Sequence, residues 1–211
     1  MSIKINLNIF LFIVLFFLTS QFDIYALVMT FALLHELGHL ICGVLLGFRV
    51  ECLKIMPLGF SVEFKTIIED YNKKILKSNV LNLKKILISI SGPLVNILVI
   101  LISYMFKLDK IIIYSNVLIL LINVIPIYPL DGGRILKYFL KLISKNKKAE
   151  YITNLISNLF GIIISFVFSI AIYYYKNISI FFAILFIWIL IFKENKRYNT
   201  YKKIYKIIDN N

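Results

Sequence analysis

Residues 24–48 read IYALVMTFALLHELGHLICGVLLGF, and the interpretation of the whole chain starts from this stretch. It is almost entirely apolar, and its length exceeds the roughly 20 residues that a helix needs to cross a bilayer. It nevertheless contains His35, Glu36 and His39. A carboxylate inside a membrane helix costs at least about 2.5 kcal/mol unless something compensates for it. The stretch therefore predicts a spanning helix that carries a functional site.

The two histidines stand four residues apart, so both imidazoles face one side of the helix on successive turns. This H-E-x-x-H spacing allows two nitrogens to bind one Zn²⁺ at about 2.0–2.1 Å. Glu36, next to His35, is then placed to act as a general base. In a soluble helix the same short pattern arises by chance on a solvated face. Here the segment offers no salt-bridge partner for Glu36, which favours the metal interpretation.

The composition places the rest of the chain in the same class. Of its 211 residues 60% are hydrophobic and 17% charged, and the mean hydropathy is +0.87. A soluble domain is only about 45–50% apolar. Apolar segments occupy residues 5–21, 24–48, 85–106, 111–130, 153–175 and 178–192. We therefore expect an all-α polytopic membrane protein whose domain, residues 1–192, has about six transmembrane helices, the first of them an uncleaved span.

The positive charges are divided between the two sides of the predicted membrane domain. Eight of the 24 Lys and Arg residues lie in residues 49–85, six in 130–151 and six in the tail 193–211. By the positive-inside rule, both termini and the loops at about 49–85 and 131–152 face the cytosol. The net charge of +13 thus reflects topology and contact with lipid headgroups. No base-reading motif is visible, so nucleic acid is not an expected partner.

A short β-hairpin is expected between the second and third spans. Residues 50–55 and 60–64 show apolar and polar residues in partial alternation, on either side of the turn at 56–59. We expect this hairpin to associate with the membrane near the histidines. Its free edge could pair with an extended protein segment, and a surface hairpin without function is the alternative.

A third metal ligand is expected at Asp131, which ends the fourth apolar segment. Pro126 and Pro129 interrupt the helix before it, because proline lacks an N–H and clashes with the preceding turn. Two glycines follow it and allow a sharp turn. The carboxylate would then lie on an irregular segment able to approach a neighbouring helix. In the alternative, Asp131 caps the helix that follows.

Together these motifs resemble the site-2 protease family of intramembrane metalloproteases. The resemblance rests on residues 35–39 (HELGH), residues 91–96 (SGPLVN) and the run from Asn123 to Asp131-Gly132. Within that family the chain looks most like the stage IV sporulation protein FB branch. The resemblance implies that His35, His39 and Asp131 bind Zn²⁺ and that Glu36 is the catalytic base. It also implies that Asn123 and Asn96 help to position the substrate.

The family also implies a function in the bacterial cell membrane. Its sporulation branch cleaves the pro-sequence of a membrane-associated sigma factor of the pro-sigma-K type, and membrane partner proteins inhibit it. Familiar members of that branch carry a nucleotide-sensing CBS domain, and we expect none in residues 193–211. Two alternatives remain: a site-2-type protease acting on another membrane-tethered regulator, and a membrane metal transporter using the same ligands. A transporter would have no need of Glu36 beside His35.

Overall fold

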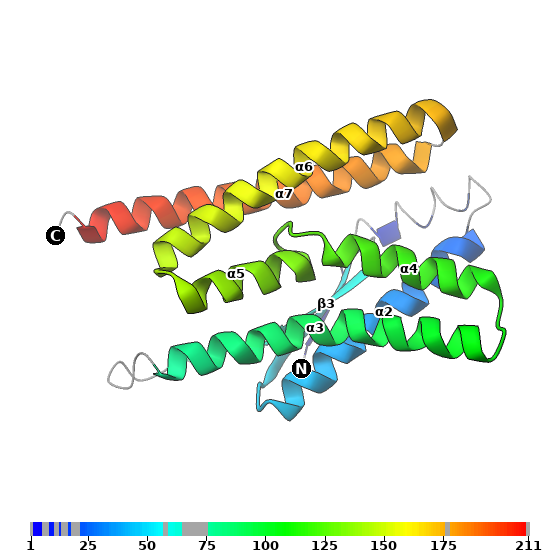
Figure 1. The fold of residues 1–211 in the computed structure, drawn as a ribbon, viewed down its shortest axis with the longest axis horizontal. Helices are drawn as coiled ribbons and strands as arrows, with labels where there is room; N and C mark the ends of the chain where they lie inside the picture. The colour runs from blue at the N-terminus through cyan, green and yellow to red at the C-terminus, as the bar shows by residue number, and fades with distance from the viewer. Residues whose placement is uncertain are drawn as a thin grey trace. The chain divides into compact units, whose positions relative to one another are not determined.

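The computed structural model describes residues 2–5, 9–10, 13, 17, 22–56, 59–64, 76–175 and 178–209. The protein is mostly helical, as the sequence predicts, and divides into two compact units, Met1–Asn123 and Val124–Asn211. The elements of the first unit are β1 (Ser2–Ile5), α2 (Phe22–Leu45), β2 (Val50–Met56), β3 (Gly59–Phe64), α3 (Leu76–Met105) and α4 (Lys110–Val124). Those of the second are α5 (Asp131–Ile143), α6 (Asn146–Tyr175) and α7 (Ile178–Asp209) (Figure 1).

In the first unit α2 packs closely against α3 because a glycine lies at their contact. A Cβ on Gly38 would lie 2.7 Å from Val95 Cγ2 and 2.9 Å from the Ser91 carbonyl oxygen. After Leu45 the chain leaves the helix through Gly47, whose φ is +86°. Phe48 N–H donates to the Gly43 carbonyl at 2.9 Å, which with the left-handed glycine forms a Schellman motif. This end fixes where the chain turns into the sheet.

The predicted hairpin is present as the antiparallel pair β2 and β3, with Leu53 opposite Val62. It belongs to a three-stranded sheet of order β1-β2-β3, in which β1 runs parallel to β2. The first strand was not predicted, since Ile5 was assigned to the first apolar span. Because β1 pairs with the outer edge of β2, the outer edge of β3 is the one hairpin edge that no described strand covers.

The second unit is built on the pair α6 and α7, which run side by side (Figure 1). Its apolar core consists of Ile127, Ile187 and Ile191. Polar contacts between the two helices accompany that core: Asn154 Nδ2 donates to Asn195 Oδ1 at 2.7 Å. Because Asn195 lies in the basic tail, this bond continues the contact between the two helices beyond the apolar core.

Three described helices are long and apolar enough to cross a membrane: Phe22–Leu45, Asn79–Met105 and Asn146–Tyr174. They correspond to the second, third and fifth predicted spans, although α3 and α6 begin earlier than expected. α4 is a shorter apolar helix at the fourth predicted span, and α7 continues from the sixth into the basic tail. Most of the first predicted span, residues 5–21, lies outside the described residues.

Candidate active site

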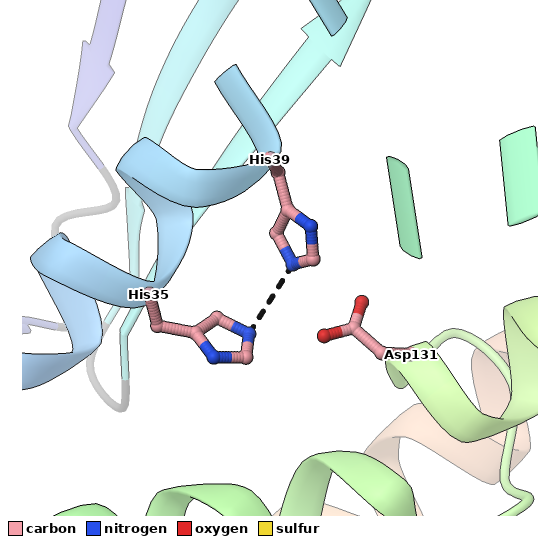
Figure 2. A group of neighbouring side chains, drawn as sticks. All are labelled: His35, His39 and Asp131. Atoms are coloured by element: carbon pink, nitrogen blue, oxygen red, sulfur yellow. Dashed lines mark hydrogen bonds between the residues drawn. The ribbon is translucent and has the colours of Figure 1, made fainter. Parts of the chain in front are cut away.

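The two histidines of α2 bring a pair of ring nitrogens together, as the spacing predicts. His35 is 4% exposed and His39 2% exposed. Their Nε2 atoms lie 3.2 Å apart, and the ring planes meet at 88° (Figure 2). Two nitrogens bound tetrahedrally to one zinc at about 2.0–2.1 Å would be about 3.3 Å apart. The pair is therefore spaced as two ligands of a single ion would be.

The other nitrogen of each ring has a hydrogen-bond partner in α3. His39 Nδ1 lies 2.6 Å from the Ile88 carbonyl oxygen, and His35 Nδ1 lies 2.5 Å from Asn96 Oδ1. Because a carbonyl oxygen only accepts, His39 donates through Nδ1, and its Nε2 is left as the basic nitrogen. Partners of this kind fix the tautomer of metal-binding histidines.

Gly92 of α3 provides the space beside the two imidazoles. A Cβ built on it would lie 2.5 Å from His39 Nε2 and 2.7 Å from His35 Nε2. Any larger residue would therefore occupy the position where the two nitrogens converge. This glycine belongs to the SGPLVN motif, and the structure gives its presence there a steric reason.

Glu36 is buried, 7% exposed, and its carboxylate accepts a hydrogen bond from the Val62 N–H of β3. The sheet therefore holds the carboxylate beside the histidine pair on α2. The same bond shows that the Val62 N–H points outward from the β2–β3 ladder. The outer edge of β3 consequently faces the candidate catalytic carboxylate.

Asp131, in the second unit, is the first residue of α5 and is 3% exposed. Leu130 occupies the N-cap position, without a side-chain hydrogen bond, so the alternative that Asp131 caps the helix is wrong. Gly132 follows Asp131, and a Cβ built on it would lie against the Val124 carbonyl oxygen. A side chain at this position would therefore collide with the backbone that precedes α5. Arg134 Nη1 lies 3.7 Å from Asp131 Oδ1.

A cluster of charges supports the turn that precedes Asp131. Glu150 of α6 pairs with Lys137 at 3.0 Å and with Arg197 at 2.9 Å. Both cations also lie over the ring of Tyr128, at 4.2 and 4.8 Å from its centroid. Burial, aided by the nearby Arg197 charge, lowers the pKa of Lys137 to about 8. This cluster joins the turn to α5, α6 and α7.

The two asparagines predicted to position substrate have protein partners. Asn96 is 1% exposed and bonds with both amide atoms, to His35 and to Asn116. Asn123 is half-buried and donates to the Ile119 carbonyl of its own helix at 3.1 Å. Their contact with substrate stays a prediction. Sequence reasoning missed Asn116, for which the only signal was an amide in a mostly apolar helix.

Comparisons with known proteins found a matching family model, a similar sequence and a similar fold. The model of Peptidase family M50 matches residues 24–110 and 107–168. Stage IV sporulation protein FB of Bacillus subtilis (strain 168) is 29% identical over 144 residues, which are 64% of this chain. That match spans 46% of the Bacillus protein. The solved site-2 protease from Methanocaldococcus jannaschii has a similar fold, with a TM-score of 0.64 and 23% identity over 91% of this chain and 89% of the archaeal one.

Proposed function

The chain belongs to Peptidase family M50, and from that premise we propose that it is an intramembrane zinc metalloendopeptidase. The observation that carries the proposal is the pair of buried Nε2 atoms 3.2 Å apart. Its substrate is a membrane-tethered protein, and the reaction is hydrolysis of a peptide bond at membrane depth. The family and the fold support the class of reaction; the pair supports a metal at this position.

We assign His35, His39 and Asp131 as the residues that hold the zinc. All three are buried, and together they offer two imidazole nitrogens and one carboxylate oxygen. This donor set of three protein ligands is typical of a catalytic zinc, which keeps a further position open. When bound, the ion supplies positive charge that polarises the scissile carbonyl and lowers the pKa of water towards about 7.

Glu36 serves as the general base. It directly follows His35 on α2 and lies three residues before His39. It is buried, and its carboxylate accepts a hydrogen bond from the Val62 N–H. Its carboxylate takes the proton of the attacking water and then delivers it to the leaving amine. Burial keeps bulk water away from that proton transfer.

The substrate enters as an extended strand along the outer edge of β3. A helical substrate hides its carbonyls in its own hydrogen bonds, so cleavage requires an unfolded segment. Pairing with an exposed strand edge supplies alternative partners for that backbone. The hydrogen bond from the Val62 N–H to Glu36 supports this route, because a strand paired along the outer edge of β3 would pass close to the Glu36 carboxylate.

We further propose that the natural substrate is the pro-sequence of a sporulation sigma factor of the pro-sigma-K type. The similarity to stage IV sporulation protein FB supports this choice. Another membrane-tethered regulator is the alternative within the same reaction class. Inhibitory membrane proteins are the expected regulatory partners.

Cleavage by the Glu36→Gln variant tests the proposal. The full chain is reconstituted in vesicles with a candidate pro-sigma factor, and the cleaved product and the bound zinc are measured. We expect the variant to lose at least about 99% of its cleavage activity, because general-base catalysis contributes about 10²-fold or more. Zinc content should stay that of the unchanged chain.

The exposed glutamate of β2 provides the matched control, since Glu51→Gln removes the same charge elsewhere. That control should cleave normally. Retained cleavage in Glu36→Gln would refute the assigned base. Zinc flux across the vesicle membrane, surviving in Glu36→Gln, would favour the transporter alternative instead.

A further inference from the structure

A chain of buried amides connects His35 to α4. His35 Nδ1 contacts Asn96 Oδ1 at 2.5 Å, and Asn96 Nδ2 donates to Asn116 Oδ1 at 2.9 Å. Asn116 Nδ2 in turn donates to the Ile112 carbonyl at 2.9 Å. Asn96 is 1% exposed and Asn116 fully buried. This series of hydrogen bonds thus runs from α2 through α3 to α4 within the first unit.

The backbone carbonyl at the far end sets the direction of every bond in this chain. Ile112 O can only accept, so the NH₂ group of Asn116 faces it and the Asn116 oxygen faces Asn96. That oxygen also only accepts, which turns the NH₂ group of Asn96 towards α4. The Asn96 oxygen is therefore left facing His35 Nδ1, which must carry the proton.

From this directionality we propose that Asn116 is a positioning residue for the metal site. Acting through Asn96, it fixes the tautomer of His35 in which Nε2 is the basic nitrogen facing His39. The inference rests on the proposed function, since it concerns the zinc ligands named there. Asn116 touches neither ring itself.

The two histidines differ in how they depend on side chains. His39 is held by the backbone carbonyl of Ile88, which no substitution removes. His35 is held by an amide whose two ends are nearly isosteric, so Asn96 alone would accept either orientation. Asn116 removes that choice, because a reversed Asn96 would turn its oxygen towards the Asn116 oxygen, and neither can donate. A substitution of Asn116 in α4 should therefore change the tautomer of His35 and leave that of His39 unchanged.

The first test is Asn116→Leu, a change of similar size that removes the acceptor for Asn96. With no acceptor in α4, Asn96 is free to reverse and to donate to His35 Nδ1, which would move the imidazole proton to Nε2. Zinc affinity of the full chain in detergent is measured by competition with a chelator. We expect a loss of at least about tenfold, as for other outer partners of metal-binding histidines. Ser115→Ala, at the preceding buried position of α4, is the matched control and should keep its affinity.

A double-mutant cycle with Asn96→Asp separates tautomer control from packing. A carboxylate at position 96 only accepts, so it holds the His35 Nδ1 proton whatever residue occupies position 116. In the Asn96→Asp background, Asn116→Leu should therefore change zinc affinity less than about twofold. A loss that persists there would show that the substitution acts by disturbing packing, and would overturn the inference.

A direct readout of the tautomer needs no bound zinc. The ¹⁵N chemical shifts of the imidazoles in metal-free protein distinguish protonated from unprotonated ring nitrogens, and the chain has only two histidines. We expect the Nδ1-protonated form of His35 in the unchanged chain and a shift towards the Nε2-protonated form in Asn116→Leu. An unchanged spectrum together with unchanged affinity would refute the role of Asn116. Failure of the unchanged chain to bind zinc would instead refute the proposed function.

Discussion

At the scale of single residues, the site depends as much on a missing side chain as on those present. Gly92 lies where a methyl group would come within 2.7 Å of both Nε2 atoms. The Gly92→Ala variant should therefore separate the two rings and lower zinc affinity at least about tenfold, which corresponds to about 1.4 kcal/mol. Chelator competition on the purified chain measures this affinity.

A second crowded helix glycine serves as the control for that prediction. A Cβ on Gly161 would meet the end of the Ile191 side chain, and neither residue lies among the assigned ligands. Gly161→Ala should leave zinc affinity unchanged. Equal affinity in Gly92→Ala and the unchanged chain would mean that the imidazoles adjust freely, contrary to the steric argument.

The candidate ligands of α2 can be recognised from the sequence because the pattern that marks them is local. His35 and His39 lie within one helical turn, and a buried Glu36 has few structural explanations in an apolar segment. Asn116 could not be identified in this way, because its role depends on a partner 20 residues away in another helix. The sequence likewise could not decide whether Asp131 is the N-cap of α5, because the observed N-cap, Leu130, is only one residue earlier.

At the scale of elements, the hairpin was predictable and the third strand was not. The alternation in residues 60–64 indicates a strand by itself, whereas β1 is only four residues long and is defined by pairing with Cys52–Ile55, far along the chain. That pairing matters for function, because β1 covers one edge of the hairpin. The remaining edge is that of β3, beside Glu36.

The outer edge of β3 yields a prediction at Phe60. N–H groups alternate in direction along a strand, so the Phe60 N–H faces the same way as that of Val62. Phe60→Pro removes this donor without touching the Val62 bond to Glu36. We expect cleavage to fall about tenfold while zinc content stays unchanged, as measured in the vesicle assay. Phe60→Leu retains the N–H and should cleave normally; equal rates in the two variants would exclude substrate pairing at this edge.

At the scale of the whole molecule, the distribution of charge predicts orientation in the membrane. We propose a domain of residues 1–192 with cytosolic loops at about 49–85 and 131–152, and a cytosolic tail at 193–211. The turn after α3 contains Leu108, and the turn between α5 and α6 contains Lys145. Lys145 lies in the strongly basic loop, so the positive-inside rule assigns it to the cytosol and Leu108 to the opposite side.

Single cysteines at these two turns test that orientation. In a chain carrying Cys42→Ser and Cys52→Ser, a membrane-impermeant maleimide applied to intact cells should label Leu108→Cys and leave Lys145→Cys unlabelled. In inverted vesicles the pattern should reverse, because the cytosolic face is then outside. Labelling of both cysteines from one side would place α4 and the start of the second unit differently from the proposed topology.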